Sequence, residues 1–316
     1  MKLSVVLITY NQERFIAQAI ESVATQRTNF EYEVVIGDDC STDRTREIIT
    51  GFHNRYPDRI VPIFREHNLG ANRNLEAALE SCRGEYVALL EGDDYWVSAD
   101  KLQRQIDFLD SHPDYAISCH RVQMVDEMGT GGAGLFPPRS AGTYTIEDLL
   151  AGNFIMTATT VYRRSLAPSL PDWFHEFKLG DWPLCALIAR FGKIHLMDDA
   201  MAVYRIHSDG IWSGSSEANR LRETARMLAA LDSTLAFRYT KIIRQTIAKS
   251  YCRMAALSRD QDDRVATVRN IRSCLQSGGL GEVLTVRSLA GFAAYLLIGQ
   301  RYRTFSKASR TTQPRA

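Results

Sequence analysis

The sequence predicts an α/β fold with a mostly parallel central sheet, followed by a helical region. Short apolar runs rich in β-branched residues alternate with amphipathic stretches at helical spacing, the pattern of strands joined by crossover helices. Strand signals stop near residue 215, after which the sequence becomes helical and rich in arginine. We therefore expect two domains, residues 1–215 and residues 216–316.

The predicted elements follow in a regular order. Residues 3–8 are almost all apolar, which predicts a strand buried on both faces. A helix is expected from the spacing of Phe15, Ile16, Ala19, Ile20 and Val23. Further strands are expected at 34–36, 60–64, 86–90, 116–125, 194–197 and 202–206. Further helices are expected at 43–56 (with Ser41 or Thr42 near its N-cap), 72–82, 101–111 and 181–190. Residues 129–142 hold five glycines and two prolines, which predicts a flexible loop of the kind that forms lids.

The composition, with 45% apolar and 24% charged residues, is that of an ordinary soluble globular protein. The net charge of +1 conceals a division: residues 1–215 hold 20 Lys and Arg against 30 Asp and Glu, whereas residues 216–316 hold 18 against 7. Such asymmetry predicts different partners for the two regions. The six cysteines lack CxxC spacing, which excludes the usual zinc frameworks. We expect a cytoplasmic protein without a signal peptide, because residues 2–4 already read as a strand. We also expect no integral membrane protein, because the longest apolar stretch, 289–299, is too short to cross a bilayer.

Three polar turns follow directly after predicted strands. They are Thr9-Tyr10-Asn11, Asp38-Asp39-Cys40-Ser41 and Glu91-Gly92-Asp93-Asp94. In an open parallel sheet the carboxyl ends of the strands meet at one edge, where ligands bind. The three turns are therefore predicted to contribute to one site.

The third turn places three carboxylates within four residues at the end of an apolar strand. Like charges this close are tolerated when a divalent cation neutralises them, and Mg²⁺ and Mn²⁺ favour carboxylate oxygens. Gly92 permits a sharp turn or the close approach of a ligand. Taken alone, the run is equally typical of a solvated acidic turn.

The first two turns offer groups suited to a nucleotide. Asp38 or Asp39 could accept hydrogen bonds from a base or a ribose, or could favour the N-terminus of the next helix. Thr9, Tyr10 and Asn11 supply a hydroxyl, an aromatic ring and an amide, although any polar turn could contain them. Each turn is ambiguous until its position among the others is considered.

Four segments in succession resemble the motifs of the inverting glycosyltransferases of family two, which have the Rossmann-like GT-A fold. The segments are Leu7–Asn11, Ile36–Asp43, Asn68–Asn74 and Gly84–Asp94. The resemblance covers roughly residues 1–215 and is specific to the family, although not to one activity. It implies a sheet flanked by helices and transfer of a sugar from a nucleotide-sugar.

The resemblance also implies roles for individual residues. The nucleotide would be held by Thr9, Tyr10, Asn11 and one of Asp38 or Asp39, with Arg73 near the base or the diphosphate. Arg73 on its own would equally be an exposed helix arginine. The metal-binding DxD signature of the family begins here with glutamate, so that Glu91, Asp93 and Asp94 are the candidate ligands of Mg²⁺ or Mn²⁺, Asp93 foremost.

Two later segments complete the implied site. Family members place a base in a Glu-Asp pair at the start of a helix, and the matching segment here is Gly180-Asp181. Glycine replaces the glutamate, which leaves Asp181 as the candidate base that removes a proton from the acceptor hydroxyl. Without the family context Asp181 would be read as a helix N-cap. His207 matches a late histidine that contacts the metal or the diphosphate.

The implied donor is a nucleotide-sugar, with uridine the commonest carrier in the family and thymidine or guanosine left open. The acceptor would be a glycan, a polyprenyl-diphosphate-linked sugar or another hydroxyl compound, in cell-surface polysaccharide synthesis. One alternative is a nucleotidyltransferase, although residues 9–13 lack the glycine-rich basic loop that holds triphosphate. The other is a non-catalytic protein that binds glycans or nucleotide-sugars.

The basic C-terminal region has two interpretations. An apolar face of Leu284, Leu289, Phe292, Leu296 and Leu297 beside arginines would suit a helix lying on anionic lipid, at the inner face of the membrane. The same residues would suit a helical subdomain packed on the first domain. We expect no nucleic-acid partner, because no recognisable module supports one.

Overall fold

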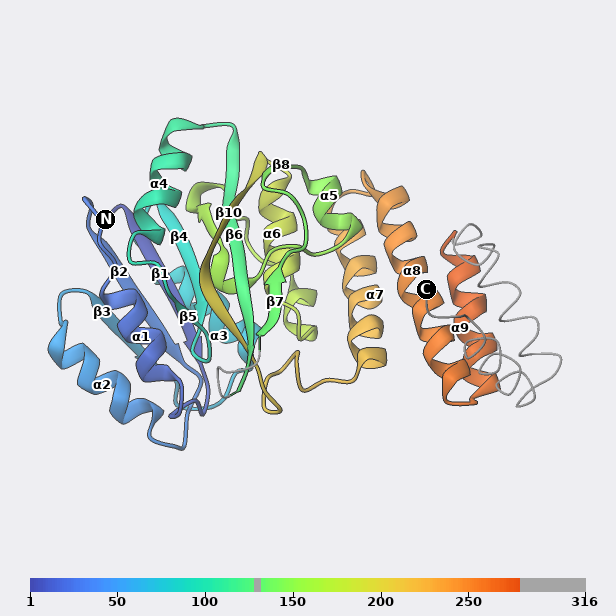
Figure 1. Cartoon of the computed structure of the whole chain (residues 1–316), viewed down its shortest axis with the longest axis horizontal. Helices are drawn as coiled ribbons and strands as arrows, with labels where there is room; N and C mark the ends of the chain where they lie inside the picture. The colour runs from blue at the N-terminus through green and yellow to red at the C-terminus, as the bar shows by residue number, and fades with distance from the viewer. Residues whose placement is uncertain (128–131, 279–316) are drawn as a thin grey trace, which may run out of the picture. The chain divides into compact units, whose positions relative to one another are not determined.

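A computed structural model of the chain describes residues 1–127 and 132–278. The chain forms two compact units, Met1–Gly214 and the residues from Ser215 onward, which are described here one at a time. The first unit is the α/β body that carries the candidate site (Figure 1).

The strands of the first unit, in chain order, are β1 (Leu3–Thr9), β2 (Tyr32–Asp38), β3 (Ile60–Phe64), β4 (Tyr86–Glu91), β5 (Tyr95–Trp96), β6 (Tyr115–Asp126), β7 (Gly132–Phe136), β8 (Gly142–Tyr144), β9 (Val161–Arg163) and β10 (Lys193–Ile206). Its α-helices are α1 (Ile16–Ala24), α2 (Thr45–Arg55), α3 (Ala71–Glu80), α4 (Lys101–Ser111), α5 (Ile146–Ala151) and α6 (Asp181–Ala189). Three short 3₁₀ helices are η1 (Thr157–Thr159), η2 (Arg164–Leu166) and η3 (Asp172–Glu176).

These strands form one mixed sheet in the order β3-β2-β1-β4-β9-β6-β10-β5, with β7 paired to β6 and β8 to β10. β3, β2, β1 and β4 are mutually parallel, as the sequence predicts. Beyond β4 the sheet becomes mixed, because β9 runs antiparallel to both β4 and β6, whereas β6 and β10 are parallel. The predicted parallel sheet is therefore confirmed for the half in which the three polar turns occur.

Helices cover both faces of this sheet (Figure 1). Leu3, Val5 and Leu7 of β1 point to the face that packs against α1, α2 and α4, with Ile20 and Leu102 among the contacting residues. The opposite face lies against α3, which packs on β1 and β2, and α6, which packs on β6. Burial on both faces explains why the first strand is an uninterrupted apolar run.

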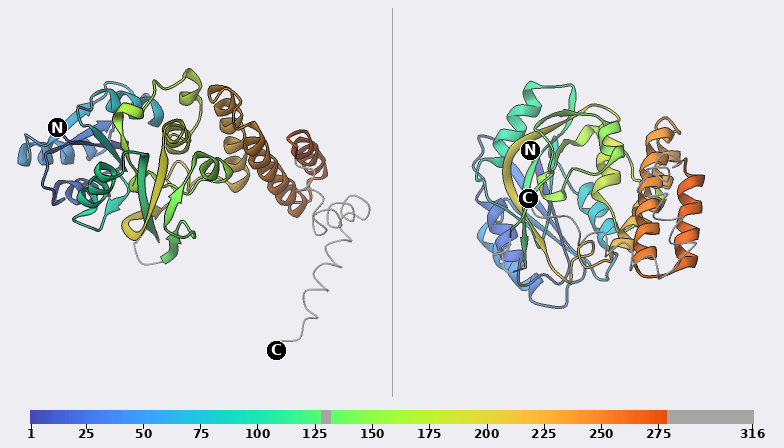
Figure 2. Two further views of the ribbon diagram at one scale, coloured as in Figure 1. Left: turned by 90° about the horizontal axis from the view of Figure 1, so that it is seen from above. Right: turned by 45° about the vertical axis from the view of Figure 1, so that its right-hand side comes forward.

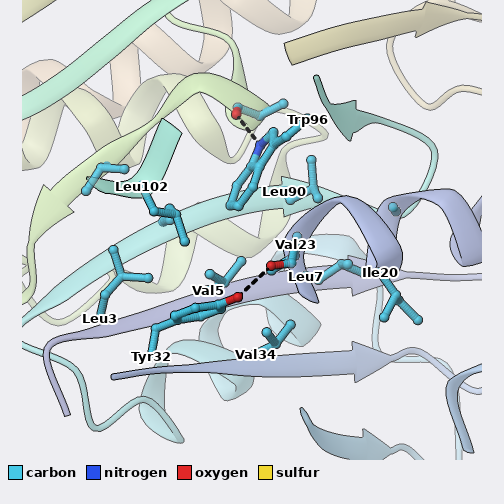
Figure 3. Packing of buried hydrophobic residues seen from close by; sticks show 14 of the residues in the cluster. Leu3, Val5, Leu7, Ile20, Val23, Tyr32, Val34, Leu90, Trp96 and Leu102 are labelled. Atoms are coloured by element: carbon cyan, nitrogen blue, oxygen red, sulfur yellow. Dashed lines mark hydrogen bonds between the residues drawn. The ribbon is translucent and has the colours of Figure 1, made fainter. Parts of the chain in front are cut away.

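Two aromatic side chains, Tyr32 and Trp96, lie in the core and form hydrogen bonds to backbone carbonyls (Figure 3). The Tyr32 hydroxyl donates to the Val23 carbonyl over 2.8 Å, and the Trp96 indole N–H donates to the Ala158 carbonyl over 2.8 Å. Both rings are almost fully buried. Their bulk fills the core, and their hydrogen bonds avoid the cost of an unsatisfied buried donor.

Three local predictions are wrong. Residues 132–136, predicted to lie in a flexible loop, form β7 on the edge of β6, where backbone pairing orders a glycine-rich segment. The two strands predicted at 194–197 and 202–206 are one strand, β10, continued through bulges near Asp198 and Asp199. α2 begins at Thr45 rather than next to Ser41 or Thr42, because Asp43 accepts a hydrogen bond from the Thr45 N–H over 3.0 Å.

The second unit contains α7 (Glu217–Thr234), α8 (Thr240–Asp260) and α9 (Arg264–Gln276). α8 packs against both of the others (Figure 2). Within residues 1–127 and 132–278, no helix has the length and apolarity needed to cross a bilayer. The apolar face predicted between Leu284 and Leu297 lies outside the described residues.

Candidate active site

The three polar turns meet at one edge of the sheet because β2, β1 and β4 are adjacent and parallel. Thr9 at the end of β1 is in register with Asp38 at the end of β2, and Ile8 is in register with Glu91 at the end of β4. The sheet therefore brings together turns that are separated by up to 80 residues in sequence. This edge is the candidate active site.

The acidic turn after β4 is compact. One carboxylate oxygen from each of Glu91, Asp93 and Asp94 lies within 4.8 Å of the others. Gly92 lets the acidic turn lie against the turn after β1, because a Cβ there would lie 2.3 Å from Gln12 Oε1 and 2.7 Å from Thr9 Oγ1. The sequence predicted a sharp turn or the close approach of a ligand, whereas the structure shows the close approach of a neighbouring turn.

Burial and neighbouring negative charges disfavour the ionised forms of Glu91 and Asp94. Burial, together with the charges of Asp93 and Asp181, raises the pKa of Glu91 to about 8. Burial and its acidic neighbours raise the pKa of Asp94 well above its ordinary value. Asp94 Oδ1 accepts the Arg205 N–H over 2.9 Å, whereas the buried Oδ2 accepts no hydrogen bond from the part of the chain that the structure describes.

A hard divalent cation fits this donor set. Carboxylate oxygens are the ligands that Mg²⁺ and Mn²⁺ prefer, and a bound cation would satisfy the unpaired Asp94 oxygen while removing the repulsion that raises both pKa values. Glu91, Asp93 and Asp94 are thus the residues that could hold the ion.

The end of β10 closes the site from the other side. His207 Nε2 lies 3.0 Å from Asp93 Oδ2, and this hydrogen bond raises the pKa of the imidazole. The Arg205 guanidinium lies over the rings of Phe15 and Tyr95 and donates to the Asp93 carbonyl. The structure therefore places the predicted His207 next to Asp93. Arg205 is a further residue of the site that the sequence did not predict. Its position two residues before His207 was the only local indication of this.

Asp181, the first residue of α6, lies close enough to the acidic turn for its charge to raise the pKa of Glu91. Burial raises the pKa of Asp181, and the nearby Thr157 and Asn153 side chains and the backbone at the start of α6 oppose this effect. Thr157 also opposes the rise in the pKa of Glu91. Thr157 and Asn153 were not predicted, since neither belongs to a recognisable motif.

The first two turns are joined by hydrogen bonds across the sheet edge. The Thr42 N–H donates to Asn11 Oδ1 over 2.8 Å, and the Asn11 N–H donates to Ser41 Oγ over 2.9 Å. Asn11 has a positive φ of 51°, which an asparagine tolerates better than most residues. Tyr10 beside it is 47% exposed and presents its ring to solvent.

The two aspartates after β2 are buried and engaged by protein donors. Asp38 accepts hydrogen bonds from Arg46 Nε over 2.6 Å and from the Ser41 N–H over 3.1 Å. Asp39 accepts the N–H groups of Leu69 and Gly70 over 2.7 Å and 2.9 Å. The pair therefore organises the turns themselves, and contact of either carboxylate with a base or a ribose stays a prediction.

The predicted Arg73 and the tryptophan that follows Asp181 differ in accessibility. Arg73 is exposed on the first turn of α3 and is accessible to a ligand at this edge. Trp182, next to Asp181, is buried and donates its indole N–H to the Leu149 carbonyl over 3.1 Å. Its ring therefore packs in the core at the N-terminal end of α6.

Comparison with known proteins agrees with this fold and this site. Residues 4–168, just over half of the chain, match the model of glycosyl transferase family 2. The chain is also 41% identical over 237 residues to the uncharacterized protein Rv1520 of Mycobacterium tuberculosis, covering 74% of this chain and 68% of the relative. The chain belongs to glycosyl transferase family 2 and is a glycosyltransferase.

Two further proteins with solved structures are similar. The Staphylococcus aureus poly(ribitol-phosphate) beta-N-acetylglucosaminyltransferase TarS is 29% identical over 218 residues, covering 66% of this chain and 36% of TarS. The structure of TarS residues 1–349 in complex with UDP-GlcNAc aligns with a TM-score of 0.58 at 20% identity, covering 89% of this chain and 92% of that chain. The mannosyltransferase PcManGT from Pyrobaculum calidifontis, in complex with GDP-Man and Mn²⁺, aligns with a TM-score of 0.57 at 16% identity, covering 97% of this chain and 83% of that chain. At these identities the alignments establish the shared GT-A fold.

Proposed function

We propose that this glycosyltransferase is metal-dependent and inverting, and that it transfers a sugar from a nucleotide-sugar to a hydroxyl of a glycan or a lipid-linked acceptor. The observation that supports the proposal is the cluster of Glu91, Asp93 and Asp94, whose carboxylate oxygens lie within 4.8 Å of one another, with Asp181 close enough to raise the pKa of Glu91. One carboxylate on the acceptor side and a cation-binding group on the donor side are what direct displacement requires.

In the proposed reaction the acceptor oxygen attacks the anomeric carbon while the bond from that carbon to the diphosphate breaks. Asp181 takes the proton of the acceptor hydroxyl, and the nucleoside diphosphate leaves with the bonding electrons. Burial raises the pKa of Asp181, which makes its carboxylate a stronger base than an exposed aspartate. Held by Glu91, Asp93 and Asp94, a divalent ion would supply positive charge to the leaving diphosphate.

The nucleotide is proposed to bind over the first two turns. Tyr10 offers an exposed ring for the base, and Arg73 offers a cation for the diphosphate. Thr9, Asn11, Asp38 and Asp39 are proposed to hold these turns and to complete the nucleotide contacts. Donor complexes of the two similar structures, UDP-GlcNAc with TarS and GDP-Man with PcManGT, support a nucleotide-sugar and leave the base open.

Cell-surface polysaccharide synthesis is proposed as the biological setting. TarS, by its name, glycosylates a poly(ribitol-phosphate). A similar polymer or a polyprenyl-diphosphate-linked glycan would supply the acceptor hydroxyl here.

The test is replacement of Asp181 by Asn, which keeps the size of the side chain and removes its basicity. We expect sugar transfer to fall by about 10²-fold to 10⁴-fold, while the dissociation constant of the nucleotide measured by calorimetry stays the same. Assays would screen UDP-GlcNAc and GDP-mannose with MgCl₂ or MnCl₂, and NMR of the product would report the anomeric configuration. Retained configuration, or near-normal transfer by Asp181→Asn, would overturn the proposed mechanism.

The basic region 216–316 is proposed to be a second domain that brings the enzyme to the inner membrane surface. Its excess of 18 Lys and Arg over 7 Asp and Glu favours anionic lipid. Flotation with phosphatidylglycerol vesicles should carry the full chain upward at low salt and release it at high salt. Equal flotation with neutral phosphatidylcholine vesicles would contradict the electrostatic interpretation.

A further inference from the structure

Asn72 links the donor side of the site to the segment that precedes Asp181. It lies in the first turn of α3 and is buried, with 6% of its surface exposed. Its amide nitrogen donates to the Phe174 carbonyl over 2.9 Å and to the Phe177 carbonyl over 2.7 Å. A primary amide has two N–H donors, and Asn72 thus uses both to hold the chain just before α6.

Gly180 and Asn72 are fitted to each other. A Cβ at position 180 would lie 2.3 Å from Asn72 Oδ1, closer than any normal contact. The Asn72 side chain cannot swing aside without leaving two buried carbonyls unsatisfied. This contact explains why glycine stands next to Asp181, where the family resemblance leads one to expect glutamate.

A second contact joins the same two segments. His175 Nε2 lies 3.0 Å from Glu76 Oε2, one helical turn beyond Asn72 on α3. The start of α3 is itself fixed to the second polar turn, because Asp39 accepts the Leu69 and Gly70 N–H groups. α3 therefore forms a continuous connection from the Asp38-Asp39 turn to the segment that carries Asp181.

We propose that Asn72, with Gly180 as its fitted partner, is a positioning residue that sets the location of Asp181 relative to the donor side. The inference rests on the proposed role of Asp181 as the base. The Asn72 amide nitrogen donates to backbone carbonyls of residues 174–179, and Asn72 therefore acts on Asp181 through that segment.

The same helix supplies a matched control. Asn74 is also buried, its amide nitrogen donates to the Gly37 carbonyl over 2.7 Å, and a Cβ at Gly37 would lie 2.8 Å from Asn74 Oδ1. The chemistry is the same, but its target is β2 rather than the segment before α6. A substitution at Asn74 thus reproduces the loss of a buried amide without releasing residues 174–179.

The first experiment compares Asn72→Asp with Asn74→Asp in the full chain by hydrogen–deuterium exchange. Aspartate keeps the shape of asparagine and loses both N–H donors. We expect exchange in residues 174–181 to become at least about tenfold faster in Asn72→Asp and to stay unchanged in Asn74→Asp. Equal exchange in that segment for wild type and Asn72→Asp would overturn the anchoring.

The second experiment measures turnover of UDP-GlcNAc or GDP-mannose, whichever the wild type uses. We expect Asn72→Asp to lower kcat by about tenfold to a hundredfold, because a misplaced base reduces the rate of the chemical step. The dissociation constant of the nucleoside diphosphate should change by less than about twofold, because Asn72 acts on the segment before Asp181. A loss confined to KM or to nucleotide affinity would contradict a positioning role for the base.

Gly180→Ala tests the pair from the other side and does not depend on the folding of Asn72→Asp. We expect it to lower kcat in the wild type and to cost at least about threefold less in an Asn72→Ala background, where the clashing oxygen is absent. Additive losses would overturn the fitted contact. If Asp181→Asn retains normal turnover, the proposed base is wrong, whereas the exchange experiment still decides the anchoring.

Discussion

The two halves of the candidate site satisfy their polar groups in different ways. On the side of the first two turns, both buried carboxylates accept hydrogen bonds from protein donors. Asp39 accepts two backbone N–H groups, and Asp38 Oδ2 accepts the Arg46 guanidinium and the Ser41 N–H, although Asp38 Oδ1 is buried without a donor from the described residues. On the side of β4, Glu91 and Asp94 have raised pKa values, and Asp94 Oδ2 is buried without a donor from the described residues.

This difference indicates in which half the protein itself balances the carboxylate charges. Asp38 is paired with the Arg46 guanidinium, and both oxygens of Asp39 accept backbone N–H groups. The acidic turn is destabilised by its own charges, and a cation or a proton would relieve it. We therefore expect substitutions in the first half to affect folding and those in the second to affect binding and turnover.

The largest expected effect is that of Asp93→Asn on turnover. It removes a charge from the candidate cation site and leaves a side chain of the same size beside His207. We expect sugar transfer to fall by at least about 10²-fold. The denaturation midpoint should not fall, because the substitution removes a charge that contributes to the raised pKa values of Glu91 and Asp94. Titration with MgCl₂ and MnCl₂ would show whether a higher metal concentration restores part of the rate. Full activity of Asp93→Asn at ordinary metal concentration would contradict the view that substitutions in the acidic turn affect turnover.

The next effect is a loss of stability in the first half. Asp39→Ala leaves the Leu69 and Gly70 N–H groups without their acceptor. We expect the free energy of unfolding to fall by about 3 kcal/mol, because each hydrogen bond to a charged group contributes about 1.5–3 kcal/mol. Urea denaturation measures the change. Asp58→Ala, at an exposed aspartate, is the control and should alter stability by less than about 0.5 kcal/mol. Equal losses in the two variants would remove the structural role of Asp39.

A smaller effect sharpens the comparison through pH. The folded pKa of Glu91, about 8, lies above its ordinary value of 4.5, so the folded metal-free protein binds more protons than the unfolded chain between these two values. The contribution of Glu91 to stability is therefore most favourable at low pH and is lost as the pH rises toward 8. A cation binds the ionised carboxylate, and the rise in Tm on adding MgCl₂ should be larger by a few degrees (about 2–4 °C) at pH 8.5 than at pH 6.0.

Glu91→Gln provides the control for that experiment. In the absence of metal the variant should lose the part of the pH dependence that Glu91 contributes and melt above the wild type at pH 8.5, because the buried charge is gone. Calorimetric melting curves with and without MgCl₂ supply both comparisons. A wild-type Tm that rises between pH 6.0 and 8.5 without metal would contradict the electrostatic account of the acidic turn.

Much of the fold could be predicted from the sequence, because the local residue patterns favour the same helices and strands that the tertiary structure contains. Lys101–Ser111 is the helix that its periodicity predicts, and Ile60–Phe64 is the strand that its apolar run predicts. Predictions are wrong where pairing with distant strands decides the outcome. Residues 132–136 carry glycines that locally favour a loop, yet β6 supplies hydrogen-bond partners that order them as β7.

Part of the candidate site could be predicted from the sequence, because some of its residues are neighbours in the chain. Glu91, Asp93 and Asp94 belong to one turn, and their clustering is local. Thr157, Asn153 and Arg205 have no local signal, because their partners lie on other segments of the chain. The role of Gly180 could not be predicted either, since it depends on the position of the Asn72 amide more than a hundred residues earlier.

The sequence by itself determined that the first strands form a parallel sheet and that their turns meet at one edge, because apolar periodicity marks the strands and the connections between them are short. The family was predicted from the resemblance of four motifs. Only the tertiary structure decided which buried carboxylates are paired with protein donors, which repel one another, and how the segment before Asp181 is held by Asn72. Those properties depend on distances between segments far apart in the chain, which no local pattern encodes.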